Sequence, residues 1–247
     1  MSLRAIKIEP AKYDDIPVLA GISSDSFEGD TQTEMKQHGR APFDMREYSL
    51  TSLPGSLKSP RLRIIKAVEE STGDIMGYCI WGFRGVEPPV FPPVDFGTDD
   101  ATGPTEQTKT KEQEKDKTDD STDPIARLEK LTGTDFNNWV DELMADGSPC
   151  LFIVGLYVAP SFQRRGAGTA LLKWGTDLAD ANGAFAWVHS SAGAWRAYEK
   201  AGFRTVRTLT VNLDNYAPVP APETYPDGRW GDYTFRYMVY GKHPGTT

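Results

Sequence analysis

The sequence predicts an α+β protein, and three observations indicate this class. A continuous apolar run at 151–158 predicts a strand buried on both faces. A glycine-rich turn at 163–168 follows it, and the apolar residues after the turn recur at helical spacing. Further apolar runs, separated by turn residues, predict strands both before and after this unit. Helices packed on a sheet are the architecture that such a pattern favours.

The strand–turn–helix unit at 151–182 is the most informative stretch. Its helix carries Leu171, Trp174 and Leu178 on one side and ends at Asn182-Gly183, a typical C-terminal stop. A strand that leads through glycines into a helix N-terminus presents unpaired N–H groups and the positive end of the helix dipole. This arrangement binds phosphate; the alternative is an ordinary strand–helix connection.

The elements before this unit follow from local patterns. Asp14-Asp15 is expected to cap a helix that carries Ile16, Leu19 and Ala20. The other expected elements are a strand at 3–8, short helices at 31–37 and 43–50, and a hairpin of strands at 62–68 and 75–83. Asp123-Pro124 begins one predicted helix and Thr134 or Asp135 a second, because Gly133 interrupts the pattern. After the unit we expect a strand at 184–189, a helix at 192–201 and strands at 206–213 and 233–240.

Composition narrows the class of protein. The 247 residues suffice for one large domain or two small ones, and the formal net charge of −8 argues against nucleic-acid binding as the main function. Cys79 and Cys150 both lie in apolar runs, which favours buried free thiols and a reducing compartment. No apolar run is long enough for a membrane span and no signal peptide begins the sequence, so we expect a soluble, cytoplasmic protein.

Two motifs carry a resemblance to a known family. The turn QRRGAG at 163–168 lacks the third glycine of the dinucleotide fingerprint and the Gly-Lys-Ser/Thr of the Walker motif. It resembles Q/R-x-x-G-x-G/A, the acyl-CoA pyrophosphate loop of the GNAT acyltransferase superfamily. The downstream stretch AWRAYEKAGF at 194–203 resembles a second motif of that family. The sequence is therefore identified as similar to the GNAT superfamily, and to its fungal-type members.

The resemblance implies a fold and a donor substrate. The fold is an α/β/α sandwich in one domain at 1–247, with a mostly antiparallel six- to seven-stranded sheet that splays between its fourth and fifth strands. Gly155 is expected to mark the bulge that opens the splay. The donor is acetyl-CoA, held by the strand backbone, the turn and a residue near the next strand. These residues are Leu156, Tyr157, Val158, Gln163, Arg164, Arg165, Gly166, Ala167, Gly168, Thr169 and Ser191.

The resemblance also implies catalytic roles. Tyr198 matches the family tyrosine that protonates the leaving thiolate; its alternative is a core aromatic residue. A backbone N–H near Tyr157 or Val158 would polarise the thioester carbonyl. The family's glutamate base is absent, and His189 stands at the matching position of the fifth strand. With a reference pKa of about 6.5, His189 can accept the ammonium proton at neutral pH; its alternative is a hydrogen-bonded core residue.

The expected function is acetyl transfer to the amine of a small molecule, by a monomer or homodimer without a metal, nucleic acid or membrane partner. Two alternatives remain open at this point: an acyl-CoA-binding or regulatory module without transfer activity, and an O-acyltransferase. The sequence does not identify the acceptor.

A biased stretch at 88–123 interrupts the domain. Glu87–Pro93 holds four prolines, and Asp99–Asp123 consists almost wholly of Thr, Asp, Glu, Lys and Gln. Because this stretch has almost no core-forming residues, it is expected to be a disordered insertion between the third and fourth strands; a docking or regulatory arm is the alternative.

The insertion is predicted to be dispensable. Deletion of Gly97–Asp120 should leave the melting temperature and the activity nearly unchanged, because loop-closure free energy changes by only a few tenths to about 1 kcal/mol. Thermal unfolding and thioester turnover of the shortened protein check this. Loss of solubility or stability would mean that the stretch packs on the domain.

Overall fold

The sheet at the centre of the protein has seven strands in the order β1-β2-β3-β4-β5-β7-β6. The computed structural model describes residues 5–39, 42–91, 122–144 and 147–243. Neighbouring strands are antiparallel, except for the parallel pair β4–β5. The mostly antiparallel, six- to seven-stranded sheet is confirmed. Its strands are β1 (Ile6–Pro10), β2 (Leu62–Glu69), β3 (Ile75–Arg84), β4 (Cys150–Val158), β5 (Phe185–Ser190), β6 (Arg204–Asn212) and β7 (Asp232–Tyr240).

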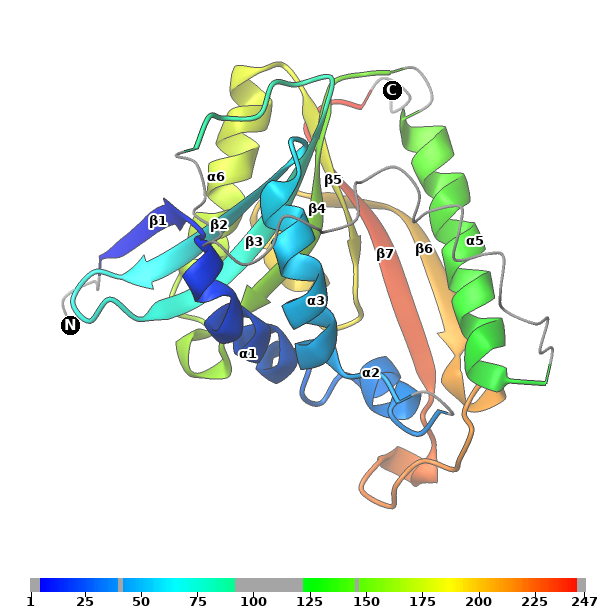
Figure 1. The fold of residues 1–247 in the computed structure, drawn as a ribbon. Helices are drawn as coiled ribbons and strands as arrows, with labels where there is room; N and C mark the ends of the chain where they lie inside the picture. The colour runs from blue at the N-terminus through cyan, green and yellow to red at the C-terminus, as the bar shows by residue number, and fades with distance from the viewer. Residues whose placement is uncertain (1–4, 40–41, 92–121, 145–146, 244–247) are drawn as a thin grey trace.

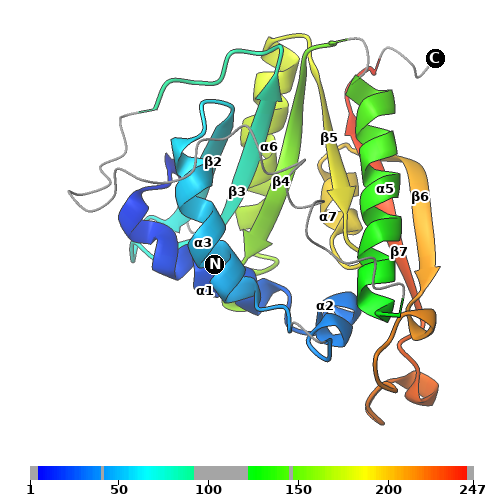
Figure 2. The same cartoon turned by 45° about the vertical axis from the view of Figure 1, so that its right-hand side comes forward.

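Helices cover both faces of the sheet and complete the three layers (Figure 1). One face carries α6 (Ala167–Ala181) and α7 (Trp195–Lys200). On the opposite face α1 (Ile16–Ser26) and α3 (Met45–Lys58) cover β2–β4, whereas α5 (Pro124–Met144) covers β5 and β7 (Figure 2). The short helix α2 (Thr31–Lys36) lies near the lower end of α5 in this view. The predicted α/β/α sandwich is therefore confirmed.

The core follows the two-residue alternation of the strands. Leu151 and Ile153 of β4 face α6, together with Trp81 of β3. Phe152, between them, faces α5 instead. The buried cysteines Cys79 and Cys150 are both free thiols, as predicted. In the described part of the chain no helix is long and apolar enough to cross a membrane.

Two helices differ from their predicted extent. A single helix, α5, runs through Gly133, where two helices were expected. Its apolar side continues from Leu128 to Trp139 and packs against the sheet, and this packing outweighs the low helix propensity of one glycine. The other, α3, extends through Pro54 to Lys58, beyond the expected end at 50, because it packs along α1 and β2.

Two further expectations concern termini and loops. Asp15 does not cap α1 with its side chain; its carboxylate accepts hydrogen bonds from the Lys12 N–H and from Lys66 Nζ, each at 2.7 Å.

At the insertion, Arg63 Nε donates to the Pro89 carbonyl at 2.6 Å, and the Phe91 and Trp174 ring centroids lie 6.1 Å apart. The rest of the insertion, 92–121, lies outside the described residues, as do positions 3–4 of the first strand.

A close contact between Gly175 of α6 and Trp81 predicts a stability difference between two helical glycines. A Cβ at Gly175 would lie 2.2 Å from the Trp81 ring, whereas a Cβ at Gly133 would meet nothing within 4 Å. Gly175→Ala should lower the free energy of unfolding by about 1–3 kcal/mol through overpacking. Its control, Gly133→Ala, should raise it by up to about 1 kcal/mol. Denaturant unfolding measures both; equal effects would contradict the packing of Trp81 over Gly175.

Candidate active site where two parallel strands separate

Strands β4 and β5 separate partway along their length. They pair from Cys150 and Phe185 as far as Ile153 and Val188, and β4 continues to Val158 without this partner. Strand β3 stays paired with β4 along the same stretch, so only the β5 side of β4 loses its neighbour. The predicted splay between the fourth and fifth strands is therefore confirmed.

A β-bulge lies at the point of separation. Ile80 pairs with Gly155 and Trp81 with Ile153, which leaves Val154 as the extra residue, one position before the expected Gly155. The glycine has a separate steric reason, since a Cβ there would lie 2.4 Å from the Tyr157 ring. Gly155 thus lets this ring pack over the strand beside the bulge.

The backbone of β4 beyond the bulge offers groups to the open side. The Ala159 N–H donates to the Met76 carbonyl of the β3 side at 3.0 Å. Because backbone groups alternate in direction, Tyr157 also faces β3, and the N–H groups of Leu156 and Val158 face the open side. The Val158 carbonyl accepts bonds from Ser26 Oγ at 3.2 Å and from Gln163 Nε2 at 3.3 Å. Of the two N–H groups proposed to polarise a carbonyl, only that of Val158 faces the gap.

The glycine-rich turn is exposed and leads into α6. Gly166 precedes the helix with φ +97°, a conformation that favours glycine, and its carbonyl accepts the Ala170 N–H at 2.9 Å. Arg164 also has a positive φ of 60°. Alternating left-handed residues curve the backbone so that successive N–H groups converge, and the first turn of a helix has no internal partner for its N–H groups.

The side chains of the turn leave its backbone accessible. Gln163, Arg164, Arg165 and Thr169 are exposed, and the Arg165 guanidinium lies over the Phe162 ring at 5.4 Å. Ala167 is buried against the core. At Gly168 a Cβ would meet only Val158, at 3.6 Å, so a methyl group would fit there. Packing within the protein therefore does not require a glycine at this position.

Tyr198 of α7 is 4% exposed and packs in the core beneath α6 and β3–β4. Burial raises the pKa of its phenol, and the nearby Cys79 and Tyr157 raise it further. The phenol is consequently protonated at neutral pH. Tyr157 packs in the cluster on the opposite face of the sheet.

His189 of β5 lies on the α5 face, among aromatic rings. Its ring stacks on Tyr237 at 4.6 Å and on Phe235 at 5.0 Å, and Phe136 of α5 lies at 5.4 Å. Burial lowers the pKa of His189 to about 4, against a weaker opposing effect of Asp135. Nε2 is buried and has no hydrogen-bond partner among the described residues. The imidazole is therefore neutral at pH 7, and its Nε2 atom makes no hydrogen bond to the described residues.

Ser191 and a group of residues that the sequence patterns did not single out lie at the end of β5. The Ser191 hydroxyl bonds the phenol of Tyr233, which is also bonded by the Ala192 N–H. Tyr233 in turn donates to Asp30 Oδ2 at 2.8 Å, just before α2. Ser26, at the end of α1, bonds β4 at Val158, and Asp30, just before α2, bonds Tyr233 of β7. The segment between α1 and α2 is therefore attached on both sides of the gap between β4 and β5. Nothing in the sequence near Tyr233, in a different strand, connects it with Asp30.

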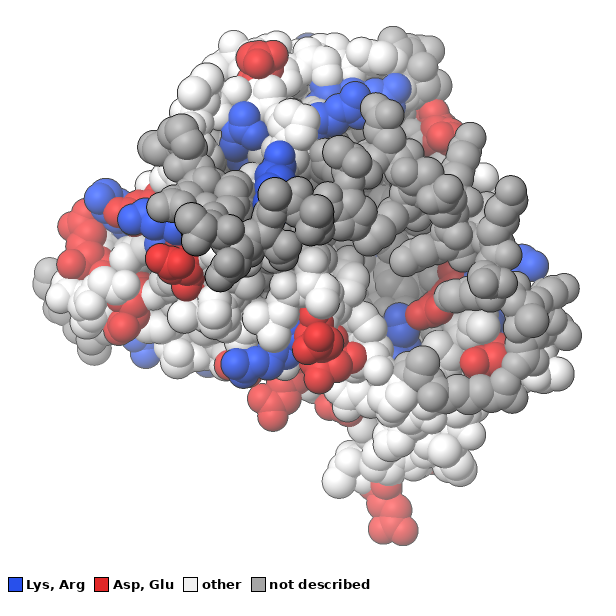
Figure 3. All heavy atoms as spheres, in the orientation of Figure 1, with Lys and Arg blue, Asp and Glu red and all other residues white. Residues whose placement is uncertain are grey.

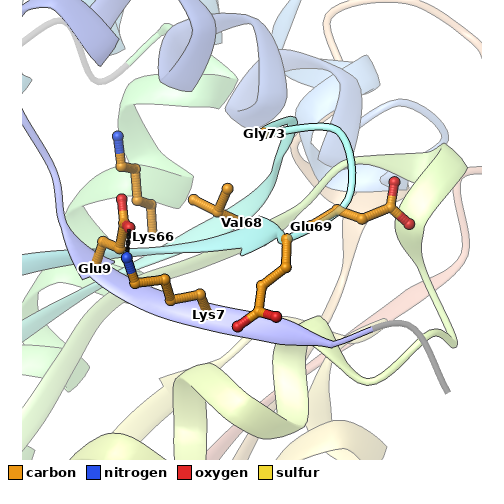
Figure 4. A pocket seen from close by; sticks show the side chains of 7 residues that line it. Lys7, Glu9, Lys66, Val68, Glu69 and Gly73 are labelled. Atoms are coloured by element: carbon orange, nitrogen blue, oxygen red, sulfur yellow. Dashed lines mark ion pairs between the residues drawn. The ribbon is translucent and has the colours of Figure 1, made fainter.

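A charged hollow of about 560 Å³ lies elsewhere, at the β1–β2 edge of the sheet (Figure 4). Lys7 pairs with Glu9 at 2.6 Å and Lys66 with Asp15 at 2.7 Å, so these charges already have partners. None of the predicted site residues lines this hollow. The separation of β4 and β5 is therefore the better candidate for an active site.

Comparisons with known proteins agree with this geometry. The model of the acetyltransferase (GNAT) family matches residues 125–203, which extend from α5 through β4, α6 and β5 to α7. No curated protein matches the sequence. The narrower resemblance to fungal-type members finds no support in these comparisons.

Solved structures share the fold at low sequence identity. A Drosophila melanogaster polyamine N-acetyltransferase that forms N-acetylagmatine is 13% identical, with a TM-score of 0.53 over 96% of this chain and 100% of that chain. Arylalkylamine N-acetyltransferase 2 from Aedes aegypti is 19% identical, with a TM-score of 0.52 over 96% and 98%. A structure described as histone acetyltransferase HPA2 and related acetyltransferase from Corynebacterium glutamicum is 14% identical, with a TM-score of 0.51 over 98% and 99%. The acetyltransferase (GNAT) family model thus matches the part of the chain that carries the candidate site, and the solved structures show that the fold around it is shared with N-acetyltransferases.

Proposed function

We propose that the protein transfers an acetyl group from acetyl-CoA to the amine of a small molecule. One observation carries this proposal: the unpaired side of β4 beyond Ile153 leads directly to the glycine turn and the N-terminus of α6. The first offers hydrogen bonds to an extended amide chain, and the second binds phosphate. A pantetheine arm joined to a pyrophosphate has both of these chemical parts in this order.

The residues present fit this donor. The Val158 N–H would bind a pantetheine amide, and the N–H groups of Gly166 to Thr169 would bind the pyrophosphate. Arg164 and Arg165 are exposed beside the turn and supply positive charge. Ser191 already bonds Tyr233, so its hydroxyl is only partly available to the donor. Acetyl-CoA supplies the activated acetyl thioester.

The transfer needs one bond made and one broken. The neutral amine nitrogen bonds the acetyl carbon, the carbon–sulfur bond breaks, the thiolate takes one proton, and the nitrogen loses one. Tyr198 is the proposed proton donor to sulfur, because its raised pKa keeps the phenol protonated. The Leu156 N–H, which faces the gap farther from the turn than that of Val158, is the proposed hydrogen-bond donor to the thioester oxygen.

His189 is proposed to accept a hydrogen bond from the amine, directly or through water, at its unpartnered Nε2. A pKa of about 4 makes the imidazole a weaker proton acceptor than the reference value of about 6.5 suggests.

The net charge of −8 favours the arrival of cationic amines. Figure 3 shows carboxylates along the lower part of the face that carries α1 and α3.

The donor site predicts a specific loss of affinity. Gly168→Glu adds bulk and negative charge where phosphate is proposed to bind, so acetyl-CoA affinity should fall at least about tenfold. The control Gly133→Glu adds the same group to α5, where a Cβ meets nothing within 4 Å, and should bind normally. Calorimetry measures affinity and circular dichroism the fold. Normal affinity in a folded Gly168→Glu protein would exclude the donor site from this turn.

The acid role predicts a loss in turnover. Tyr198→Phe removes one hydroxyl and keeps the ring, so kcat should fall roughly 10²-fold or more while acetyl-CoA binding changes little. Tyr240→Phe is the matched control, because its hydroxyl bonds Asp180 instead, at 2.8 Å. Release of free coenzyme A with amines and with alcohols as acceptors gives the rates. It also separates N-transfer from O-transfer, and a binding module from both. Equal rates in the two variants would remove Tyr198 from the chemistry.

The pKa of His189 predicts where activity depends on pH. The sequence alone suggests an acid limb of kcat/KM near pH 6–7, but burial moves the limb owed to His189 to about pH 4. Activity tied to this residue should therefore persist as pH falls from 7 to 5, and His189→Ala should lower kcat/KM across that range. A limb near 6–7 that survives in His189→Ala would assign it to another group.

A further inference from the structure

Two large apolar side chains are exposed on the sheet face opposite α6, beside the separated strands. Val154, the bulged residue in the middle of β4, is 53% exposed, and Tyr48 of α3 is 56% exposed. A side chain at the centre of a sheet that carries helices on this face would ordinarily be covered. In Figure 2, α1 and α3 lie to one side of β4 on this face and α5 lies to the other. The exposed surface of β4 at Val154 is called the opening below.

Aromatic rings border this opening on the α5 side. Phe152, two residues before Val154 in β4, stacks on Trp187 at 5.5 Å. Phe136 of α5 lies 6.1 Å from Trp187 and 5.4 Å from His189. Phe136, Phe152 and His189 are each only partly buried. One wall of the opening is therefore aromatic.

The opposite wall is also aromatic and is held in place. Tyr157 stacks on Tyr78 at 4.7 Å with the rings tilted by 23°, and Tyr48 lies near enough to raise the pKa of the Tyr157 phenol. Tyr78 is 1% exposed and hydrogen-bonds Ser23 and Ser49, whose hydroxyls lie 2.7 Å apart. The Tyr157 ring is therefore fixed between Tyr78 and the strand at Gly155.

On the α5 side and at the α2 end, the acidic side chains near the aromatic rings already have partners. Asp135, beside Phe136, pairs with Arg207 and accepts the Tyr237 hydroxyl at 2.5 Å. His189 is neutral at pH 7. The carboxylates of Asp30 and Glu34 belong to the α2 end, where they accept the hydroxyls of Tyr233 and Tyr225. A second positive charge placed beside Phe136 and Phe152 would therefore lose water without gaining an unpaired anionic partner there.

We propose that the acceptor is a primary amine with an aromatic body, which lies on Val154 between Tyr48–Tyr157 and Phe136–Phe152. This inference rests on the proposed acetyl transfer, because it names the class of amine that the same site takes. Ring stacking and apolar contact bind the body, while the single amino group extends toward the thioester. A linear amine with a cationic group at each end does not fit this surface.

Kinetics with two probes test the substrate class. With acetyl-CoA as donor, kcat/KM for 2-phenylethylamine should exceed that for agmatine, which carries a second positive charge, by about tenfold or more. Release of free coenzyme A gives both values. Equal values, or a preference for agmatine, would overturn the inference and direct attention to Asp30 and Glu34.

A pair of valine variants tests the position. Val154→Asp places a carboxylate under the proposed ring and should lower kcat/KM for 2-phenylethylamine by about tenfold or more. The control Val18→Asp changes a valine of α1 that is 50% exposed, a similar fraction, and should leave the value within about twofold. An unchanged value in Val154→Asp would show that the ring does not lie on Val154.

Binding separates this inference from the proposed function. Calorimetry with 2-phenylethylamine and coenzyme A should show binding to the wild type and to Val18→Asp, and at least about tenfold weaker binding to Val154→Asp. If this pattern holds while no amine is acetylated, the transfer fails and the aromatic-amine site stands. If the wild type does not bind 2-phenylethylamine, the inference fails, whatever the rates with other amines.

Discussion

The loss of pairing between β4 and β5 after Ile153 is the constraint on which the rest of the site depends. A sheet interior normally satisfies every backbone group, so two diverging strands must leave N–H and C=O groups for other partners. Side chains from both sides meet part of this need, as Ser26 and Gln163 do at the Val158 carbonyl. The N–H groups left over face the gap, directly before a helix N-terminus. The proposed donor site rests on this arrangement of unpaired groups.

The two faces of the sheet contribute different residues to the surroundings of this gap. The α6 face supplies the turn, the helix N-terminus and Tyr198 within a closely packed core. The opposite face is interrupted between α3 and α5, so that Val154 stays exposed at the centre of the molecule. Tyr198 on the first face and Tyr157 on the second both belong to the surroundings of β3 and β4. The proposed donor and acceptor would meet at the gap between β4 and β5.

Local patterns predicted the fold and the strand–turn–helix unit at 151–182 well, because both depend on neighbours in sequence. The strand, turn and helix at 151–182 are consecutive, and the sheet follows from strand alternation. The long α5 was missed because tertiary packing outweighs Gly133. The low pKa of His189 comes from rings on β7 and α5, and the link from Asp30 to Tyr233 joins residues distant in the chain. The acceptor side is built from such long-range contacts, so the sequence could name its candidate residues but not their surroundings.

The pairing of Gly82 with Phe152 bears on how this sequence can diverge. The two residues are cross-strand partners, and a Cβ at Gly82 would lie 2.2 Å from the Phe152 ring. A larger residue at 82 is therefore compatible only with a smaller one at 152, and the two positions should change together among descendants of this sequence. Phe152 is one of the aromatic residues of the proposed acceptor site. A substitution at Gly82 that required a smaller residue at 152 would therefore also change that site. Selection for packing and selection for substrate would then act on the same pair of residues.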